Sequence, residues 1–550
     1  MDNRTLNDLP VLSAGAGGRN PLQLAPLQAG VVAAGQVGPF AVNGQRAQAN
    51  NFMLDGGDSN DLAINVPDAI QGFSPDALQE FRIITNTFSA EYGRNSGSVV
   101  NVISKSGTNQ FHGNVFEYFR NRVLNATPFF NNVAGLGNPK FNVNEFGGTL
   151  GGPVIKEKTF FFFSYLGFRR RQGVTSSATV FTDAERDAIS QFGTPQAIAL
   201  MNLVPQANSG DTLFSSGNVT QNRNQYIGKV DHAFTDNNRL FVSFFTEKQD
   251  DIAPFAFGGS PIPGFGTRGD LRFTNVVIGH TSVLNSNLVN EARVSFHRRG
   301  TFSVIPQNTT TLASLGINGI IPDDAAAEGP PNVRIAGLSQ FGNTIQGPQG
   351  RFDNTFQYSD NLSQRLGSRH NLKYGADIRT YAQNQIFDFI NSGLYVVDGS
   401  VSDALGLAPL PGLSLPLSDF ARGFTTVYVQ NSDGRKGYRS RSFNFYGQDD
   451  FKIKPSLSLN LGLRYEFNTN LYDIRDEVAG FRLGQQSTVF PTAPTGLIFP
   501  GDAGISRSTY PSDYNNFAPR IGFAWDVLGN GRLSLRGGYG LFYDIVISET

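Results

Sequence analysis

The chain has 550 residues, far more than one average domain, so it forms several domains or one unusually large unit. Its 44 Lys and Arg residues balance its 45 Asp and Glu residues, leaving a net charge of −1. This balance excludes a polybasic nucleic-acid binder and an acidic disordered chain. The lack of cysteine excludes a disulfide scaffold, a cysteine-bound zinc site and a thiol nucleophile.

Membrane insertion by helices is also excluded, because no apolar run reaches the roughly 18 residues that a transmembrane helix needs. A membrane-spanning strand needs only about 9–11 residues, so insertion by strands stays open. The residues after Met1 lack the charged and apolar regions of a signal peptide. If the protein is exported, we therefore expect its natural chain to begin upstream of this sequence.

The first part of the chain, residues 1–106, is rich in small residues and amides and contains short β-like runs at 51–54 and 99–103. Residues 74–81 are amphipathic, with Ser74 as a candidate N-cap and proline at the first helical position. We therefore predict a small α+β domain over residues 1–106 that includes one or two helical turns at 74–81.

From residue 107 onward an alternation of apolar and polar residues dominates, and it is clearest in residues 457–468. Such alternation predicts strands with one apolar and one polar face. The leucines and Phe467 of this segment are expected on the outer face, with Arg464 and Glu466 inward. Thirteen segments show the pattern: 110–121, 143–152, 159–170, 224–234, 239–249, 270–283, 288–299, 351–365, 370–384, 440–453, 456–468, 514–527 and 531–545.

The connections between these segments alternate strictly between tight turns and long loops. Short turns at one end and long loops at the other are typical of transmembrane β-barrels. We therefore predict that residues 107–550 form part of a transmembrane antiparallel β-barrel. Because bacterial single-chain barrels have an even number of strands, we expect further strands beyond this sequence and about 22 strands in the complete barrel.

Residues 78–105 (LQEFRIITNTFSAEYGRNSGSVVNVISK) resemble the end of the plug domain of TonB-dependent outer-membrane transporters. Residues 43–56, ending in an Asp-Gly turn, and residues 9–31 are similar to earlier parts of that plug. The residues that carry the plug motif are Asp55, Gly56, Tyr92, Gly93, Gly97 and Lys105.

Further segments resemble the Oar-like subgroup of this family, namely residues 106–121, 146–165, 446–467, 515–526 and 533–544. In this chain Thr85-Asn86-Thr87 replaces the Arg-Gly-Pro that the broad family carries after the plug strand. The replacement fits the Oar-like subgroup and argues against importing a siderophore assignment. The TonB box expected near the N-terminus is missing from this sequence, so energy coupling is implied by the family alone.

The resemblance implies TonB-dependent active import of a siderophore, glycan or peptide-like substrate across the bacterial outer membrane. It implies TonB, with its inner-membrane energy-coupling proteins, as partner, and contact with outer-membrane lipid and lipopolysaccharide. No cofactor, nucleic acid or enzymatic activity is expected. The alternative is an outer-membrane adhesion or export-assisting protein of the Oar-like type. Specificity is expected in three irregular loops, 171–223, 300–350 and 385–439.

Other residue patterns favour structural roles over chemistry. The five histidines, His112, His232, His280, His297 and His370, lack metal-ligand or catalytic spacing and are expected as polar residues near strand ends. The Asp55–Asp61 run departs from a calcium loop and is expected to be a turn with solvated carboxylates. Two basic clusters are expected at the barrel rim: Arg169–Arg171 and Arg435, Lys436, Arg439, Arg441.

Aromatic residues at strand ends are expected to form the girdles that flank the apolar band of a barrel. They are Phe160–Phe163, Phe443, Phe445, Tyr446, Phe542 and Tyr543. No catalytic or metal-binding residue is predicted, and the substrate-binding residues cannot be assigned from the sequence.

Overall fold

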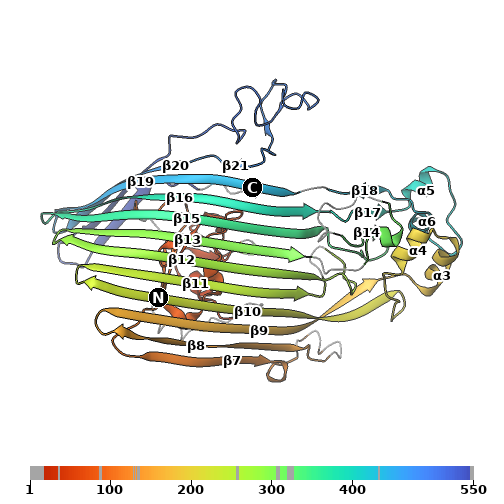
Figure 1. Cartoon of the computed structure of the whole chain (residues 1–550), viewed down its shortest axis with the longest axis horizontal. Helices are drawn as coiled ribbons and strands as arrows, with labels where there is room; N and C mark the ends of the chain where they lie inside the picture. Colours follow the sequence, from red (N-terminus) through yellow and green to blue (C-terminus); the bar gives the residue numbers. More distant parts are fainter. Residues whose placement is uncertain are drawn as a thin grey trace.

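A computed structural model describes residues 18–34, 38–85, 89–127, 129, 132, 137–255, 259–304, 310–318, 328–431 and 434–544. Its main feature is an antiparallel sheet in which thirteen described strands pair in chain order (Figure 1), and the short β21 (Tyr472–Asp473) pairs with β19. The thirteen strands are β7 (His112–Asn121), β8 (Phe141–Ile155), β9 (Thr159–Thr179), β10 (Thr212–Thr235), β11 (Asn238–Ala253), β12 (Thr267–Asn285), β13 (Leu288–Val304), β15 (Gln346–Leu366), β16 (His370–Phe389), β19 (Arg435–Lys454), β20 (Leu457–Asn468), β24 (Phe517–Asp526) and β25 (Ser534–Gly540).

Each strand overlaps one of the thirteen predicted segments, but several strands extend further toward the long loops. The largest difference is at β9 and β10, which remain paired out to Thr179 and Thr212. Much of the predicted loop 171–223 is therefore strand. The alternation of apolar and polar residues ends where the apolar outer face ends, whereas backbone pairing continues beyond it, so the sequence pattern underestimated strand length.

Short and long connections lie at opposite ends of the sheet. The short turns that join β8 to β9, β10 to β11 and β12 to β13 gather at the left in Figure 1, and helices lie at the right. The predicted alternation of tight turns and long loops is confirmed. None of the helices in the described part of the chain is long and apolar enough to cross a membrane.

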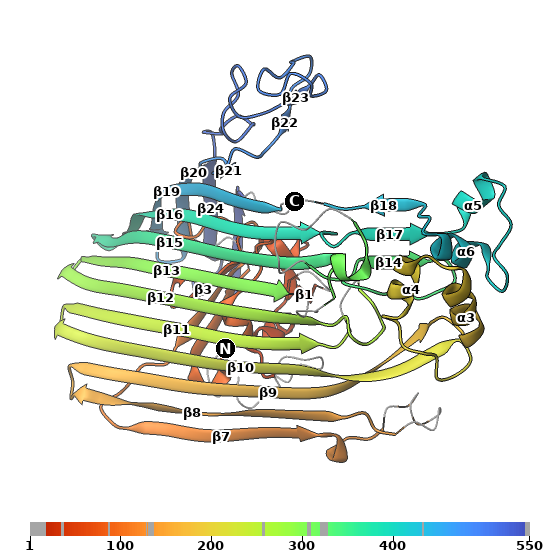
Figure 2. The same cartoon turned by 45° about the vertical axis from the view of Figure 1, so that its right-hand side comes forward.

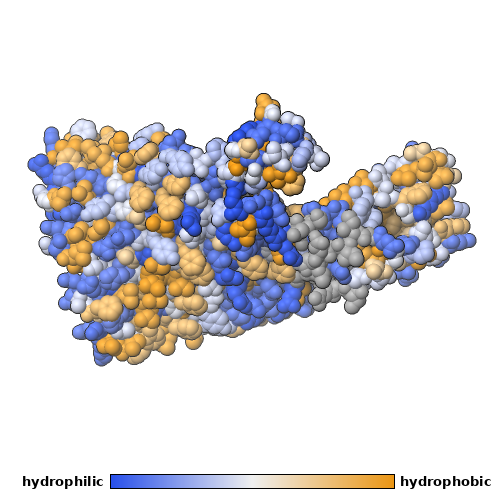
Figure 3. Space-filling view, turned by 45° about the horizontal axis from the view of Figure 1, so that its top comes forward, coloured by the Kyte–Doolittle hydropathy of each residue, from blue (hydrophilic) through white to orange (hydrophobic). Residues whose placement is uncertain are grey.

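The two faces of the sheet differ in polarity as predicted. On β20, Leu461 and Leu463 are 41% and 49% exposed on the outer face, whereas Arg464 and Glu466 are 1% and 2% exposed on the inner face. Hydrophobic residues gather in patches over the strands in the space-filling view (Figure 3). The register predicted for residues 457–468 is therefore confirmed.

The aromatic girdle predicted from strand-end aromatics is only partly correct. Phe163 and Phe445 are exposed on the outer face, but Phe162 and Tyr446 are buried on the inner face. The Tyr446 hydroxyl donates a hydrogen bond to Asn361 Oδ1 at 2.8 Å, and Phe542 packs against buried residues of the inner segment. Consecutive residues of a strand point to opposite faces, so a run of aromatics cannot all line one face.

An inner segment, residues 18–105 where described, lies within the curve of the large sheet (red and orange in Figure 2). Its core is a four-stranded sheet of order β4-β3-β6-β5, and β1 pairs with β2. These strands are β1 (Val31–Ala33), β2 (Phe40–Val42), β3 (Asn51–Leu54), β4 (Gly57–Asp58), β5 (Leu78–Ile84) and β6 (Val99–Ser104). In its described residues the helical turns are all 3₁₀: η1 (Pro21–Leu27), η2 (Ala47–Ala49), η3 (Ala69–Gly72) and η4 (Pro75–Ala77).

The one or two helical turns predicted at residues 74–81 are partly correct, since one turn forms with Pro75 at its first position. Only η4 forms there, Ser74 makes no side-chain cap, and Leu78 already pairs with Ser104 as the first residue of β5. Strand pairing with β6 satisfies these backbone groups, so the local signal for a helix start is overridden. Residues 89–105 lie against the inner face of the large sheet, where the Ala90 N–H donates to Gln448 and the Ala90 carbonyl accepts from Arg464. Residues 9–17 and the Asn86 and Thr87 positions lie outside the described residues.

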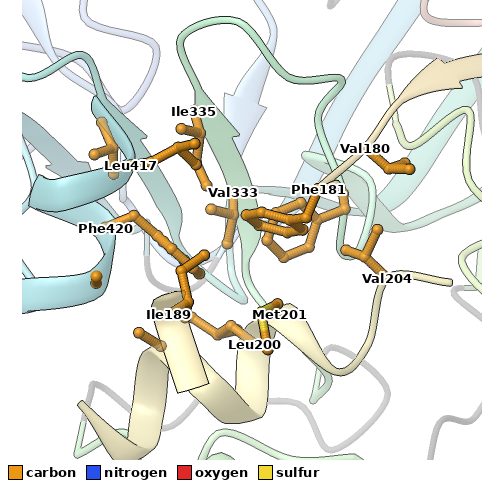
Figure 4. Packing of buried hydrophobic residues seen from close by; sticks show 14 of the residues in the cluster. Val180, Phe181, Ile189, Leu200, Met201, Val204, Val333, Ile335, Leu417 and Phe420 are labelled. Atoms are coloured by element: carbon orange, nitrogen blue, oxygen red, sulfur yellow. The ribbon is translucent and has the colours of Figure 1, made fainter. Parts of the chain in front are cut away.

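Three long loops pack together into one folded unit, the outer cap, formed by the described residues of 180–211, 310–345 and 390–434, and Ile262 and Phe265 of the β11–β12 connection are buried in the same core. The cap has one buried core, to which Phe181, Val333 and Phe420 contribute from different loops (Figure 4). Its elements are α3 (Asp183–Phe192), α4 (Pro195–Met201), η6 (Ala313–Leu315), β14 (Asn332–Ile335), β17 (Leu394–Val397), α5 (Ser400–Ala404), α6 (Leu415–Arg422) and β18 (Val427–Val429). The expectation of irregular loops is therefore wrong.

The remaining elements lie in two other connections. Residues 469–516 project from the sheet (dark blue in Figure 2) and contain β22 (Gly480–Phe481) and β23 (Leu497–Ile498). The buried Asp502 carboxylate holds this segment together by accepting hydrogen bonds from the backbone N–H groups of Thr488 at 2.7 Å and Phe499 at 2.8 Å. The turn η5 (Arg122–Leu124) follows β7.

Candidate functional site

On one side, the inner segment meets the inner face of the large sheet through apolar contacts. Ile70 and Phe73 are fully buried in one cluster with residues from β9, β10, β11 and β12, namely Phe162, Ile227, Phe245 and Phe273. The rings of Phe73 and Phe245 stack with centroids 6.0 Å apart. This cluster fixes residues 69–73 to the sheet, because separating it would expose large apolar surfaces to water.

Nearby, the contact between the inner segment and the sheet is made by buried ion pairs. Asp58 is fully buried and lies 2.9 Å from Arg94 of the inner segment and 2.6 Å from Arg379 of β16. Burial opposes ionisation of Asp58, but the two arginines outweigh it and lower the pKa of this carboxyl group. The backbone N–H of Asp58 also donates to Gln357 of β15 at 2.9 Å. Asp58 is therefore held as a carboxylate between two elements of the protein.

Two further aspartates of the same loop pair with arginines of the large sheet. Asp61 is clamped by Arg299 of β13 and by Arg351 of β15, the latter at 2.5 Å. Asp68 accepts from Arg299 at 3.0 Å and lies 3.1 Å from His297 Nε2. Asp58, Asp61 and Asp68 thus hold the loop of residues 57–68 to three neighbouring strands, β13, β15 and β16.

These ion pairs correct two expectations. The carboxylates of the Asp55–Asp61 run are buried and paired rather than solvated, and His297 lies in the middle of β13 rather than at a strand end. Sequence reasoning missed the arginine partners. One signal was present, because β13 carries polar residues at every second position inward: Glu291, Arg293, Ser295, His297, Arg299, Thr301 and Ser303. Within the described residues, no group of three or more His, Asp and Glu side chains is arranged to hold a metal ion.

The predicted motif residues Asp55 and Gly56 form the tight turn between β3 and β4, and both have positive φ angles, 50° and 83°. The Asp55 carboxylate accepts from the Ser104 backbone at 2.9 Å and from Ser243 Oγ of β11 at 2.6 Å. Lys229 Nζ of β10 lies 3.5 Å away. Asp55 therefore joins two strands of the inner segment to the large sheet.

Tyr92 and Gly93 lie next to this turn. Tyr92 packs against Met53 and Val99, and burial together with nearby Glu91 raises its pKa to about 12. A Cβ atom on Gly93 would lie only 2.2 Å from Arg464 Nε, so glycine is required for the close approach to β20.

Gly97 and Lys105 lie away from this group. The Gly97 N–H donates to Ala49 O at 2.7 Å, and a Cβ atom there would lie 2.8 Å from the same oxygen. Lys105 follows β6 and donates to Asp76 O at 2.7 Å, and burial lowers the pKa of its ammonium group. The structure therefore brings Asp55, Gly56, Tyr92 and Gly93 together and leaves the other two motif residues as separate structural contacts.

Two cavities lie between the inner segment and the large sheet. The turn-side cavity, about 370 Å³, is lined among others by Asp55, Tyr92, Arg293, Gln357, Asn361 and Arg379. The loop-side cavity, about 480 Å³, is lined among others by Ile64, Asp251, Asp270, Arg299, Phe302 and Arg351. The loop-side cavity is the candidate ligand site, because it lies at the long-loop end and combines polar with apolar side chains.

The predicted basic clusters lie toward the long-loop ends of the strands. Arg169 and Arg171 donate to amide oxygens of β10, at 2.7 Å to Asn224 and 2.9 Å to Asn222. In the second cluster Lys436 lies 3.1 Å from Glu477 and Arg439 donates to Asn384 at 3.0 Å. These local partners fit the interpretation of a polar rim.

The geometry defines the class of protein. The paired strands form a wall with an apolar outer face, tight turns at one end and a folded cap at the other, and the inner segment lies inside it. These are the features of a plugged outer-membrane barrel. Residues 103–549 match the outer membrane β-barrel domain family, and the chain belongs to that family. The protein lies in the bacterial outer membrane.

The chain is also a homologue of the TonB-dependent transporter Oar of Myxococcus xanthus, with 23% identity over 570 aligned positions. The alignment covers 92% of this chain and 47% of Oar, so the chain spans about half the length of that curated relative. The resemblance to the TonB-dependent transporters and their Oar-like subgroup is therefore confirmed.

Solved structures support the fold. The outer-membrane transporter YddB of Escherichia coli superposes with a TM-score of 0.58 at 12% identity, covering 100% of this chain and 61% of YddB. The siderophore receptor PirA of Acinetobacter baumannii superposes with a TM-score of 0.53 at 13% identity, covering 99% of this chain and 61% of PirA. These relatives are transporters and receptors rather than enzymes.

The outer apolar face allows a direct test of membrane insertion. Replacing Leu463 with arginine places a charge on the lipid face near the middle of β20 and is expected to destabilise the folded barrel by about 2–4 kcal/mol. Leu528→Arg, in the β24–β25 turn, is the matched control and should cost about 0–1 kcal/mol. Folding titrations into lipid vesicles measure both, and equal costs would contradict the assigned lipid face.

Proposed function

We propose that the protein is a TonB-dependent importer in which the inner segment is the plug domain of residues 1–106 and residues 107–550 belong to the barrel. The observation that supports this is the blocked interior: the inner segment is held to the barrel wall by buried pairs such as Asp58–Arg379. A plug held to the wall by such pairs obstructs the interior, so passage requires work on the plug. TonB, driven by the inner-membrane proteins, supplies that work.

The substrate binds in the loop-side cavity, between the plug and the inner face of the barrel wall. The charged residues that line this cavity are two aspartates, Asp251 and Asp270, and two arginines, Arg299 and Arg351, so their charges cancel. Aromatic and amide side chains, among them Phe302 and Gln349, complete the lining. A glycan or peptide-like substrate, with many hydrogen-bonding groups and little net charge, fits this lining better than a highly charged siderophore.

At the rim, the arginines beyond the apolar outer face meet the lipopolysaccharide phosphates. Arg169 and Arg171 are held in place by the amide side chains of β10 and remain half-buried on the outer face. An arginine guanidinium group can donate two parallel hydrogen bonds to a phosphate group, and this geometry suits Arg169 and Arg171 to the contact.

Uptake assays test the import function. Cells that lack the gene are complemented with wild-type or variant protein and supplied with fluorescent oligosaccharides, fluorescent peptides and siderophores loaded with radioactive iron. To search beyond these probes, we would also measure which compounds the cells remove from the culture medium. We expect uptake that stops when TonB is deleted. Arg299→Ala should lower uptake at limiting concentration about tenfold, because it removes a charged hydrogen-bond donor.

Arg298→Ala is the matched control, since Arg298 precedes Arg299 on β13 but donates to Asn354 Oδ1 on the outer face. Identical depletion by wild-type, gene-deleted and TonB-deleted cells would contradict import. Surface binding of a probe without entry would instead favour the adhesion alternative.

A further inference from the structure

The two cavities lie along one continuous polar strip of the barrel wall. The inward residues of β13 run from Arg293, which lines the turn-side cavity, through Ser295 and His297 to Arg299, which lines the loop-side cavity. The two arginines are six positions apart on the strand, about 20 Å. β15 repeats the arrangement, with Gln357 at the turn-side cavity and Arg351 at the loop-side cavity. A polar surface therefore connects the two cavities along the wall.

Residues 57–68 of the inner segment lie across this strip. Asp58 pairs with Arg379, a lining residue of the turn-side cavity, while Asp61 pairs with Arg299 and Arg351, lining residues of the loop-side cavity. Gly57 packs so closely that a Cβ atom there would lie 2.9 Å from Ser295 Cβ. This one loop therefore separates the two cavities.

The neighbouring residues are attached in a different way. Residues 69–73 follow directly and are anchored in the apolar cluster that includes Phe73 and Phe245. An ionic contact can exchange its partner for water or for a polar ligand, because charged groups are well solvated outside the protein. An apolar contact has no such substitute and loses its stabilisation when it separates. The loop of residues 57–68 can therefore leave the wall while residues 69–73 stay in place.

We propose that residues 57–68 form a gate between the two cavities and that displacement of this loop alone opens a passage along the β13–β15–β16 wall. The direction of travel, from the loop-side to the turn-side cavity, rests on the proposed import function. The gate itself does not, because its opening can be measured without TonB or substrate. The rest of the inner segment stays in the barrel during opening.

Ion conductance tests the gate. The full-length protein is reconstituted in planar lipid bilayers with potassium chloride as the probe. The double variant Asp61→Asn/Asp68→Asn keeps side-chain volume but replaces with amides the two carboxyl groups that bind Arg299 and His297. We expect the open fraction to rise about tenfold or more over wild type. Asp61→Ala/Asp68→Ala is the second variant, and gel mobility with and without heating verifies that each barrel is folded.

A disulfide then tests which part moves. The chain contains no cysteine, so Gly57→Cys/Ser295→Cys, added to the Asn variant, ties the gate loop to β13 without competing thiols. Oxidation should abolish the current and reduction should restore it. The matched control is Ala90→Cys/Gly462→Cys, which ties another part of the inner segment to β20, where a Cβ atom on Gly462 would lie 3.1 Å from Ala90 Cβ. Oxidation of the control pair should leave the current unchanged.

Three results would overturn the proposal. Folded Asn and Ala variants that stay closed would show that the aspartates do not hold the passage shut. A current that persists with the 57–295 disulfide formed would place the passage elsewhere. Equal suppression by both disulfides would mean that the inner segment moves as a whole. None of these results bears on import, which the uptake assays test separately.

Discussion

Asp58→Ala is expected to weaken the attachment of the inner segment to the barrel by about 3–5 kcal/mol, because Arg94 and Arg379 are then left buried without their shared carboxylate. Opening of the inner segment can be measured with the variant Ala49→Cys, which places a cysteine at a fully buried position. The reaction of this cysteine with a maleimide is followed as the urea concentration is raised. The urea midpoint for labelling should fall in the Asp58 variant. An unchanged midpoint would contradict the role of this pair.

Arg379 also lies 2.7 Å from Asp377, so a double-mutant cycle is needed to isolate its pair with Asp58. Asp58→Ala, Arg379→Met and the double variant form the cycle, and we expect the double variant to be more stable than the sum of the single effects predicts. Additive effects would mean that the two side chains stabilise the protein independently.

The lowered pKa of Asp58 also sets the sign of its pH dependence. A carboxyl group with a pKa below its unfolded value of about 3.9 stabilises the folded state above that pH, and the contribution is lost as the pH falls toward the folded pKa. The difference between wild type and Asp58→Ala should therefore be full at neutral pH and shrink below about pH 4. A difference that grows on acidification would contradict the ionised state of Asp58.

Phe181→Ala is expected to unfold the outer cap while the barrel stays intact. Phe181 is fully buried between Phe341 and Phe420, with ring centroids 6.1 and 5.7 Å away, and loss of such a ring costs about 3–5 kcal/mol. Limited trypsin digestion measures the effect, since Arg186 of α3 becomes a cleavage site when the cap opens.

Phe192→Ala is the matched control for this variant. Phe192 is the last residue of α3, the helix that carries Arg186, and it is 40% exposed. Its replacement should therefore change stability by no more than about 0.5 kcal/mol. Gel mobility with and without heating should show a folded barrel for both variants. Equal digestion of the two variants would contradict a shared core between the three loops.

The barrel could be predicted from sequence because its signals are local. The alternation in residues 457–468 specifies which side chains face lipid, and the turn residues Asp236 and Asn237 mark the end of a hairpin within a few positions. These patterns need no knowledge of distant parts of the chain. The thirteen strands and the inward direction of Arg464 follow from them.

The site could not be predicted in the same way, because its residues meet from distant parts of the chain. Asp61 and Arg351 are separated by 290 positions, and no local pattern links them. A carboxylate in a Gly-rich turn has the same sequence signature whether it is solvated or buried. The outer cap was missed for the same reason, since Phe181, Val333 and Phe420 lie in three loops that meet only when the strands beneath them have paired.

The shared core of the outer cap has a consequence for how the long loops can move. β14 and β17 come from different loops and pair in parallel, so two of the three loops are joined by backbone hydrogen bonds as well as by side chains. A displacement of one of these loops therefore carries the other with it. A ligand that binds to either loop acts on both.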